Sequence, residues 1–200
     1  FSPLMEIDLC GHATLAAAHI YFTEINRDAD SITFISSKNG SLEVTKKNNY
    51  LYLNFPVDLY EPISIDNDLI NMLGETPIKA FKGRDDIMCI FADEATIYNI
   101  EPNKDLLKLF PVRGLIVSAK SLDYDFVSRC FFPVTGVDED PVTGSAHTTL
   151  TPYWSKQLGK NSLLAKQVSS RGGELKCVLE GDRVIIGGEA VTYLNGFITI

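Results

Sequence analysis

Two segments of this 200-residue sequence begin alike, with a glycine, a polar residue and an alanine at the start of a predicted helix. The first is DLCGHATLAAAHIYF, residues 8–22, and the second is DPVTGSAHTTLTPYW, residues 140–154. A glycine lets the backbone turn sharply and approach a ligand closely. The free N–H groups and the dipole of a helix N-terminus favour an anion. We therefore expect Gly11 and Gly144 to open two helices whose N-termini face each other and form one anion-binding site.

The two segments align with an offset that places His12 on Ser145, but few identities survive, so the repeat is weak evidence of duplication. An ordinary interpretation is two core helices with glycine turns and Ser145 as a plain N-cap. The acidic DEDP run before the second segment favours a site instead. Four small residues should let surrounding strands enclose the first helix tightly: Ala13, Ala16, Ala17 and Ala18.

The rest of the chain is rich in short strand patterns. Residues 31–56 alternate polar and apolar positions around Asn39-Gly40 and Asn48-Asn49, which predicts three consecutive antiparallel strands. Asp66 and Gly74 are typical caps for a short helix between them. Further strands are predicted at 78–83, 86–92, 114–119, 125–133, 163–170, 173–181 and 183–200, with a short helix at 103–110. Because the strands do not alternate regularly with long helices, the pattern is α+β and not a doubly wound sheet.

Composition narrows the partners and the compartment. The net charge of −8 argues against nucleic acid and anionic membranes as partners. No apolar run is long enough to span a bilayer, and no secretory signal is visible, so a cytoplasmic location is expected. The cysteines at 10, 89, 130 and 177 have no close spacing, which predicts reduced thiols and no metal site.

The two helix segments, DLCGHATLAAAHIYF and GVDEDPVTGSAHTTLTPYW, resemble the signature segments of the PhzF family of phenazine-biosynthesis-like proteins. The resemblance continues through YDFVSRCFFP, SRGGEL and RVIIGGEAV, and so covers nearly the whole chain. It implies the diaminopimelate-epimerase-like fold, in which two similar domains each wrap a mostly antiparallel barrel-like sheet around a central helix. The active site of that fold lies between the domains, which agrees with two helix N-termini that face a shared site.

The resemblance also implies a chemistry. The family's founding enzyme isomerises trans-2,3-dihydro-3-hydroxyanthranilate by proton transfer without a cofactor, using a glutamate assisted by a histidine, an aspartate and a serine. The last three fall on His12, Asp140 and Ser145, the predicted catalytic residues. A carboxyl beside a histidine can share a proton near neutral pH. The residues predicted to bind a small carboxylated substrate are Cys10, Gly11, Gly144, His147, Arg171, Gly172 and Gly188.

The family's glutamate lies upstream of the CGHA segment, in a stretch that this sequence does not contain. The sequence also begins without Met, so we expect it to be part of a longer protein. Residues 1–57 are then the remainder of an incomplete N-terminal domain, to which a last strand at 190–200 returns. Residues 58–200 form the C-terminal domain. Relatives are often dimers, and a homodimer is expected here.

Two other functions stay open. A chain without the main glutamate would be a small-molecule-binding or scaffold protein that keeps the cleft. Amino-acid epimerases of the same fold use two cysteines as acid and base, one at each helix N-terminus. Cys10 stands at the first of these positions, but the second is Pro141, which cannot carry a proton, so a two-cysteine racemase is disfavoured. The sequence does not identify the substrate.

Overall fold

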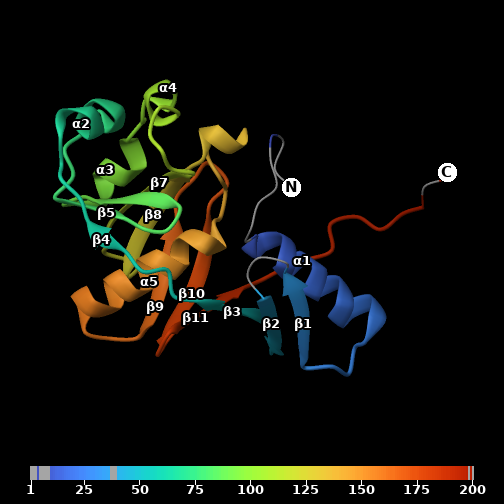
Figure 1. Cartoon of the computed structure of the whole chain (residues 1–200). Coiled ribbons are helices and arrows are strands. Elements are labelled where there is room, and N and C mark those ends of the chain that lie inside the picture. Colours follow the sequence, from blue (N-terminus) through green and yellow to red (C-terminus); the bar gives the residue numbers. More distant parts are fainter. Residues whose placement is uncertain (1–3, 5–9, 37–39, 198, 200) are drawn as a thin grey trace.

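The computed structural model describes residues 4, 10–36, 40–197 and 199. Within these residues, eleven strands form one mixed sheet in the order β1-β2-β3-β11-β10-β9-β8-β7-β6-β5-β4 (Figure 1). The strands are β1 (Ser31–Ser36), β2 (Gly40–Lys47), β3 (Tyr50–Pro56), β4 (Glu61–Pro62), β5 (Lys79–Lys82), β6 (Asp86–Ile90), β7 (Gly114–Lys120), β8 (Phe126–Phe131), β9 (Ser162–Gln167), β10 (Gly173–Glu180) and β11 (Arg183–Gly188). The helices are α1 (Gly11–Ile20), α2 (Asn67–Leu73), α3 (Glu94–Asn99), α4 (Lys104–Leu107) and α5 (Gly144–Leu158), with a π-helical turn at Tyr21–Ile25 and a 3-10 turn at Pro133–Thr135.

The first three strands form the antiparallel set that the sequence predicts. β1 pairs with β2 and β2 pairs with β3, so that Val44 lies between Ile32 and Leu53 in register. The predicted turn at Asn39-Gly40 lies partly outside the described residues, because Asn39 is not among them. β3 also pairs with β11, which joins this set to the rest of the sheet.

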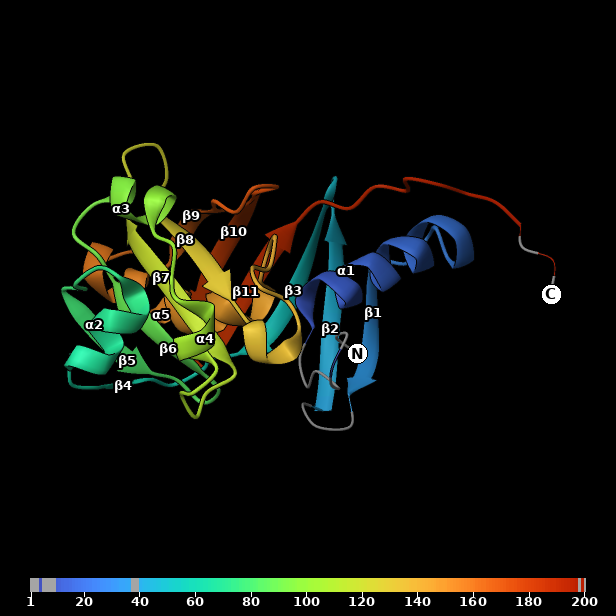
Figure 2. The same ribbon diagram turned by 90° about the horizontal axis from the view of Figure 1, so that it is seen from above.

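The first helix is enclosed less than expected. Gly11 and Ala18 are buried, but Ala13, Ala16 and Ala17 are exposed. The expectation of a tightly surrounded helix is therefore wrong for three of these four alanines. The physical reason is that the described residues supply strands on one side of α1 only, with β3 against that face (Figure 2).

The second helix is enclosed as expected. α5 lies against β9, β10 and β11, and the core on this side of the sheet includes Ala146, Leu150 and Trp154 (Figure 1). The Trp154 ring stacks on Phe126 at 5.7 Å, and its indole N–H donates to Ser118 Oγ at 2.9 Å. The ring stacking and the hydrogen bond of Trp154 together therefore fix the position of α5 along its axis relative to the sheet.

A second core lies on the opposite face of β6 and β7. In β6, Met88 and Ile90 belong to the core beneath α5, whereas Ile87 and Cys89 belong to the core beneath α2, α3 and α4. This alternation explains why β6 and β7 are apolar at successive positions, since both faces of a central strand are covered.

Two strand pairs are parallel, which the sequence analysis did not predict. β6 pairs in parallel with β7, and β8 pairs in parallel with β9. Parallel neighbours need a long crossover connection. Here α3 and α4 form the first crossover and α5 forms the second. α5 is therefore the connection that returns the chain from the end of β8 to the start of its parallel neighbour β9.

Local signals at helix ends are confirmed. The Asp66 carboxylate accepts a hydrogen bond from the Leu69 N–H at 2.9 Å, and Gly74 adopts a left-handed conformation at φ 73°. None of the helices in the described part of the chain is long and apolar enough to cross a membrane. Cys89, Cys130 and Cys177 are buried free thiols, as expected.

The domain boundary predicted after residue 57 falls just beyond the end of β3 and stays a prediction. The strand predicted at 190–200 is not present in the described residues of that stretch. Residues 189–197 extend away from the sheet, and side chains such as Val191 and Tyr193 are exposed (Figures 1 and 2). No described strand lies beside this stretch to pair with it, so its backbone forms no ladder.

Candidate active site

The N-termini of the two central helices meet. A Cβ atom built on Gly11 would lie 3.2 Å from the Gly144 Cα, and the reverse distance is also 3.2 Å. A side chain at either position would push the helices apart by a few tenths of an ångström, so the glycines are favoured by close approach rather than by unusual φ angles. The predicted convergence of the two helix N-termini is thus present in the structure.

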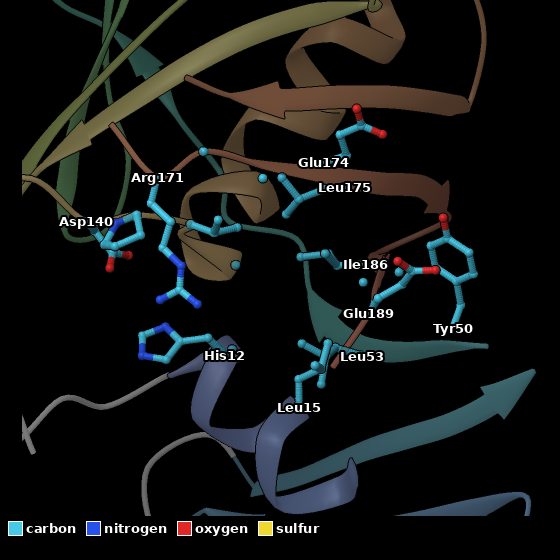
Figure 3. Close-up of a pocket in the computed structure, with 18 residues that line it drawn as sticks. His12, Leu15, Tyr50, Leu53, Asp140, Arg171, Glu174, Leu175, Ile186 and Glu189 are labelled. Carbon is cyan, nitrogen blue, oxygen red and sulfur yellow. The ribbon is translucent and has the colours of Figure 1, made fainter. Parts of the chain in front are cut away.

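A cavity of about 650 Å³ opens at this meeting point. Figure 3 shows His12 and Arg171 pointing toward each other, with Asp140 beside them at one end of the cavity. Tyr50 and Glu189 lie at the opposite end. The residues between the two ends are mostly apolar: Leu15, Leu53, Leu175 and Ile186. The cavity therefore has an end with both cationic and acidic groups, an apolar middle, and a far end that carries the carboxylates of Glu174 and Glu189. An apolar lining with a few convergent polar groups is typical of small-molecule sites.

Cys10 and His12 form a contact pair at the start of α1. The Cys10 Sγ lies 3.6 Å from the His12 Nε2. This hydrogen bond lowers the pKa of the Cys10 thiol below its ordinary value, although partial burial opposes the effect. The same hydrogen bond raises the pKa of His12, and the negative charge of Asp140 adds to the increase. The contact therefore stabilises the thiolate form of Cys10 and the protonated form of His12 relative to the isolated side chains.

Asp140 is held in place by a buried amide. Its carboxylate accepts a hydrogen bond from the Thr143 hydroxyl at 2.5 Å. The Gln167 side chain donates to the Asp140 carbonyl at 2.7 Å and to the Thr143 hydroxyl at 3.1 Å, and it accepts from the Thr143 N–H at 2.7 Å. Gln167 is 0% exposed and its bonds to Thr143 are buried, whereas the two bonds to Asp140 are partly buried. The sequence analysis missed both Gln167 and Thr143.

A second bridge joins this loop to the Arg171 turn. The Ser169 hydroxyl donates to the Pro141 carbonyl at 2.8 Å and accepts from the Gly172 N–H at 3.0 Å. Gly172 has φ +67°, a conformation that favours glycine. The bridge therefore fixes Arg171 relative to Asp140 across the charged end of the cavity. Ser169 was also missed.

Gly188 lines the cavity, and its contact with substrate stays a prediction. A Cβ atom at this position would lie 3.3 Å from the Leu15 Cδ1, so the glycine leaves room for the apolar wall.

Ser145 lies in the first turn of α5 but is not among the residues that line the cavity. Its hydroxyl oxygen accepts a hydrogen bond from the Arg113 guanidinium at 3.3 Å. Arg113 forms a bidentate ion pair with Asp86, a residue that is only 5% exposed. Burial raises the pKa of Asp86, and the bonds from Arg113 oppose that increase. A half-buried cation therefore lies next to Ser145, and no sequence motif predicted it.

His147 does not reach the cavity. It is 0% exposed, its Nδ1 lies 2.8 Å from the Thr143 carbonyl oxygen, and its ring packs on Phe126 at 5.9 Å. Burial lowers its pKa to about 4, so the ring is neutral at pH 7. The structure therefore does not support the predicted substrate contact. The physical reason is the direction of its side chain, which points from α5 into the core rather than out of the first turn.

No group of three or more His, Cys, Asp or Glu side chains in the described ranges could hold a metal ion. The charged end of the cavity instead contains one carboxylate, one imidazole and one guanidinium. These groups can bind an anion and exchange a proton.

Comparison with known structures identifies the fold class. A probable proline racemase from Agrobacterium radiobacter aligns with a TM-score of 0.62, covering 96% of this chain and 68% of that one. The identity is 12%, so this likeness shows the fold alone. It confirms the predicted diaminopimelate-epimerase-like α+β fold.

The family follows from closer relatives. Residues 1–196 match the PhzC-PhzF family of phenazine biosynthesis-like proteins. An uncharacterized isomerase of Pseudomonas aeruginosa is 44% identical over 200 residues, which is all of this chain and 76% of that protein. The crystal structure of a PhzF-family protein from Enterococcus faecalis is 45% identical, with a TM-score of 0.89 over 94% of this chain and 72% of that one. The chain therefore belongs to the PhzC-PhzF family, as predicted.

Proposed function

We propose that this protein is a cofactor-independent isomerase or epimerase that moves a proton on a small carboxylated metabolite. The observation that carries the proposal is the grouping of His12, Asp140 and Arg171 at the meeting point of two helix N-termini. Family membership and a relative named as an isomerase support the same reaction class.

In this proposal, Arg171 and the N–H groups of the two helices bind the substrate carboxylate. Binding there withdraws electron density and makes the hydrogen on the adjacent carbon more acidic. His12 and Asp140 exchange the proton, because the raised pKa of His12 lets it act as acid or base near neutral pH. The proton leaves one carbon and returns to another carbon or to the opposite face, so no redox partner is needed.

Ser145 belongs to the proposal through family resemblance. Since Arg113 donates to its oxygen, the Ser145 hydroxyl hydrogen is free to donate. Because Ser145 does not line the cavity, this role requires a carboxylate that reaches beyond the lining to the first turn of α5. The Arg113–Asp86 pair then acts as a positioning group for Ser145.

Hydrogen–deuterium exchange tests this function. The full-length protein that contains this chain is incubated in D2O with small carboxylic acids, and proton NMR follows the loss of carbon-bound hydrogen. We expect exchange in one class of acids. We expect His12→Asn and Asp140→Asn each to slow it by a factor of about 100, the usual size of a general acid–base contribution. His19→Asn is the matched control, since His19 lies on the same helix, is not among the described residues that line the cavity, and forms a side-chain hydrogen bond with Thr192 Oγ1 at 3.0 Å.

Each outcome separates the proposal from the binding-protein alternative. If some acids bind but none of the acids tested exchanges its carbon-bound hydrogen, the cavity is a binding site without isomerase activity. Exchange that is equally fast in His12→Asn and in His19→Asn would remove His12 from the mechanism.

A second candidate is an epimerase that uses the Cys10 thiolate as a base. The contact between Cys10 and His12 favours it, because the imidazole lowers the pKa of the thiol. Pro141 at the facing position argues against a pair of thiols. Under this alternative, Cys10→Ser abolishes exchange, and the matched variant Cys89→Ser, at a buried thiol outside the cavity, does not. An unchanged rate in Cys10→Ser excludes the alternative.

A further inference from the structure

A second cavity of about 450 Å³ lies between α5 and the edge of the sheet formed by β4 and β5. It shares no lining residue with the first cavity. The proposed function does not use it. It is lined by Tyr60, Pro62, Ile63, Ile65, Ile78, Lys79, Ala80, Phe81, Tyr153, Lys156 and Gln157.

Three aromatic rings form one wall. Tyr60 and Phe81 have centroids 5.1 Å apart, Phe81 and Tyr153 lie 5.5 Å apart, and Tyr60 and Tyr153 lie 6.1 Å apart. Their relative tilts of 57° to 74° leave ring edges and faces available to a planar ligand. Aliphatic side chains, among them Ile63 and Ile78, complete the apolar surface.

The two phenol hydroxyls of this wall have no hydrogen-bond partner among the described residues. Tyr153 is only 3% exposed, and it lines the cavity. Burial raises the pKa of Tyr60 and of Tyr153, so both hydroxyls are protonated at neutral pH and can donate. These hydroxyls lie at the surface of the cavity and can donate to a ligand that supplies the acceptor.

The charged groups of this cavity are cations. Lys79 Nζ lies 5.7 Å from the centroid of the Tyr153 ring and 3.4 Å from the Gln157 Oε1. Lys156 is the second cation, one helical turn after Tyr153 in the sequence. No aspartate or glutamate is found among the residues that line the cavity in the described part of the chain. On a chain with a net charge of −8, a pocket with two lysines and no carboxylate is a local exception that attracts anions.

We propose that this cavity is a second binding site, specific for a small aromatic carboxylate. The ligand ring packs on Tyr60 and Phe81, and its carboxylate lies toward Lys79 and Lys156 and accepts from the Tyr153 hydroxyl. The volume of about 450 Å³ lies within the range of ligand pockets and suits one or two fused rings. The aromatic wall selects a flat ligand, and the lysines select an acid over its amide.

Titration calorimetry with 2-naphthoate tests the site, using the full-length protein and the uncharged 2-naphthamide for comparison. Arg171→Gln serves as the background, because it weakens anion binding in the first cavity. We expect naphthoate to bind this background protein at least fivefold more tightly than naphthamide does. We expect the double variant Lys79→Gln, Lys156→Gln to lose about tenfold in affinity.

Two further variants separate the site from general effects. Tyr153→Phe keeps the ring and should weaken naphthoate about fivefold, the size of one net hydrogen bond. Lys47→Gln, Lys120→Gln removes the same charge from exposed positions outside both cavities and should leave the affinity unchanged. Equal melting temperatures of these variants and the background protein show that each is folded.

Several results would overturn the proposal. Naphthoate binding that disappears with Arg171→Gln alone places the acid in the first cavity only. Equal affinities for acid and amide remove the role of the lysines. A dimer that dissociates in the lysine double variant shows that a second copy covers this surface instead. None of these results depends on whether the first cavity is catalytic, so the two proposals fail independently.

Discussion

Replacing Gln167 with leucine tests whether one buried amide holds the loop that carries Asp140. The amide forms three hydrogen bonds to this loop, at 2.7, 2.7 and 3.1 Å, and the residue is 0% exposed. Leucine fills a similar volume but neither donates nor accepts. The Thr143 N–H and the Asp140 carbonyl therefore lose their partners, whereas the Thr143 hydroxyl keeps its bond to the carboxylate.

The expected cost follows from these two orphaned groups. Leaving a buried donor or acceptor unsatisfied costs roughly 1–3 kcal/mol, which gives roughly 2–6 kcal/mol for the pair. Part of this cost is offset, because leucine, unlike glutamine, has no polar amide that must lose its hydration when it is buried. We expect Gln167→Leu to lower the free energy of unfolding by about 3 kcal/mol.

Urea unfolding followed by Trp154 fluorescence measures this loss, and hydrogen exchange at the Thr143 amide locates it. The control is Gln157→Leu on the exposed side of α5, which should change stability by less than about 0.5 kcal/mol. A loss below about 1 kcal/mol in Gln167→Leu, with a Thr143 amide still protected from exchange, refutes the reasoning. It would show that the loop holds Asp140 without the amide.

Three other perturbations have defined signs. Alkylation by iodoacetamide at pH 7 should modify Cys10 first and should slow by roughly threefold to tenfold in His12→Asn, because the thiol pKa rises when the imidazole is removed. Arg113→Met should cost about 3–5 kcal/mol at pH 7.5 by urea unfolding, because the buried Asp86 carboxylate loses its cation. The deficit should shrink as the pH is lowered, since burial raises the pKa of Asp86 and removal of Arg113 raises it further, which favours the protonated carboxyl in the folded variant. Between pH 6.5 and pH 4 the protein should lose up to about 3 kcal/mol through His147, whose pKa of about 4 lies below its unfolded value, and His147→Leu should remove that part of the pH dependence.

The sequence was a good guide where the signal is local. The capping residues Asp66 and Gly74 and the alternation of residues 31–56 act over a few positions, and the structure has the helix and the three strands that they predict. The two parallel strand pairs could not be predicted, because a short apolar run has the same composition whether its neighbour in the sheet is parallel or antiparallel. The missed helix α3 is only six residues long, too short for a periodic pattern to stand out.

The sequence was also informative about the cavity, but unevenly. The glycines at 11 and 144 predicted the two helix N-termini correctly, since a close approach of two backbones favours glycine at the contact. Side-chain direction was harder: Ser145 and His147 are in the same turn as Gly144, and neither lines the cavity. A helix turns by 100° per residue, so neighbours in a motif point to different surroundings.

The residues that hold the site were missed because they lie outside the motifs. Gln167 occupies a buried position in β9, after Leu163 and Ala165 on the same face. A glutamine at the inward position of an alternating strand is a signal in its own right, since its amide must find partners in the core. Its partners are Asp140 and Thr143, 27 and 24 residues away in sequence. The parallel pairing of β8 with β9 brings the end of β9 beneath this loop. The positioning of Asp140 therefore depends on a non-local strand pair, and this dependence explains why the motif that contains Asp140 stood out in the sequence while the residues that support it did not.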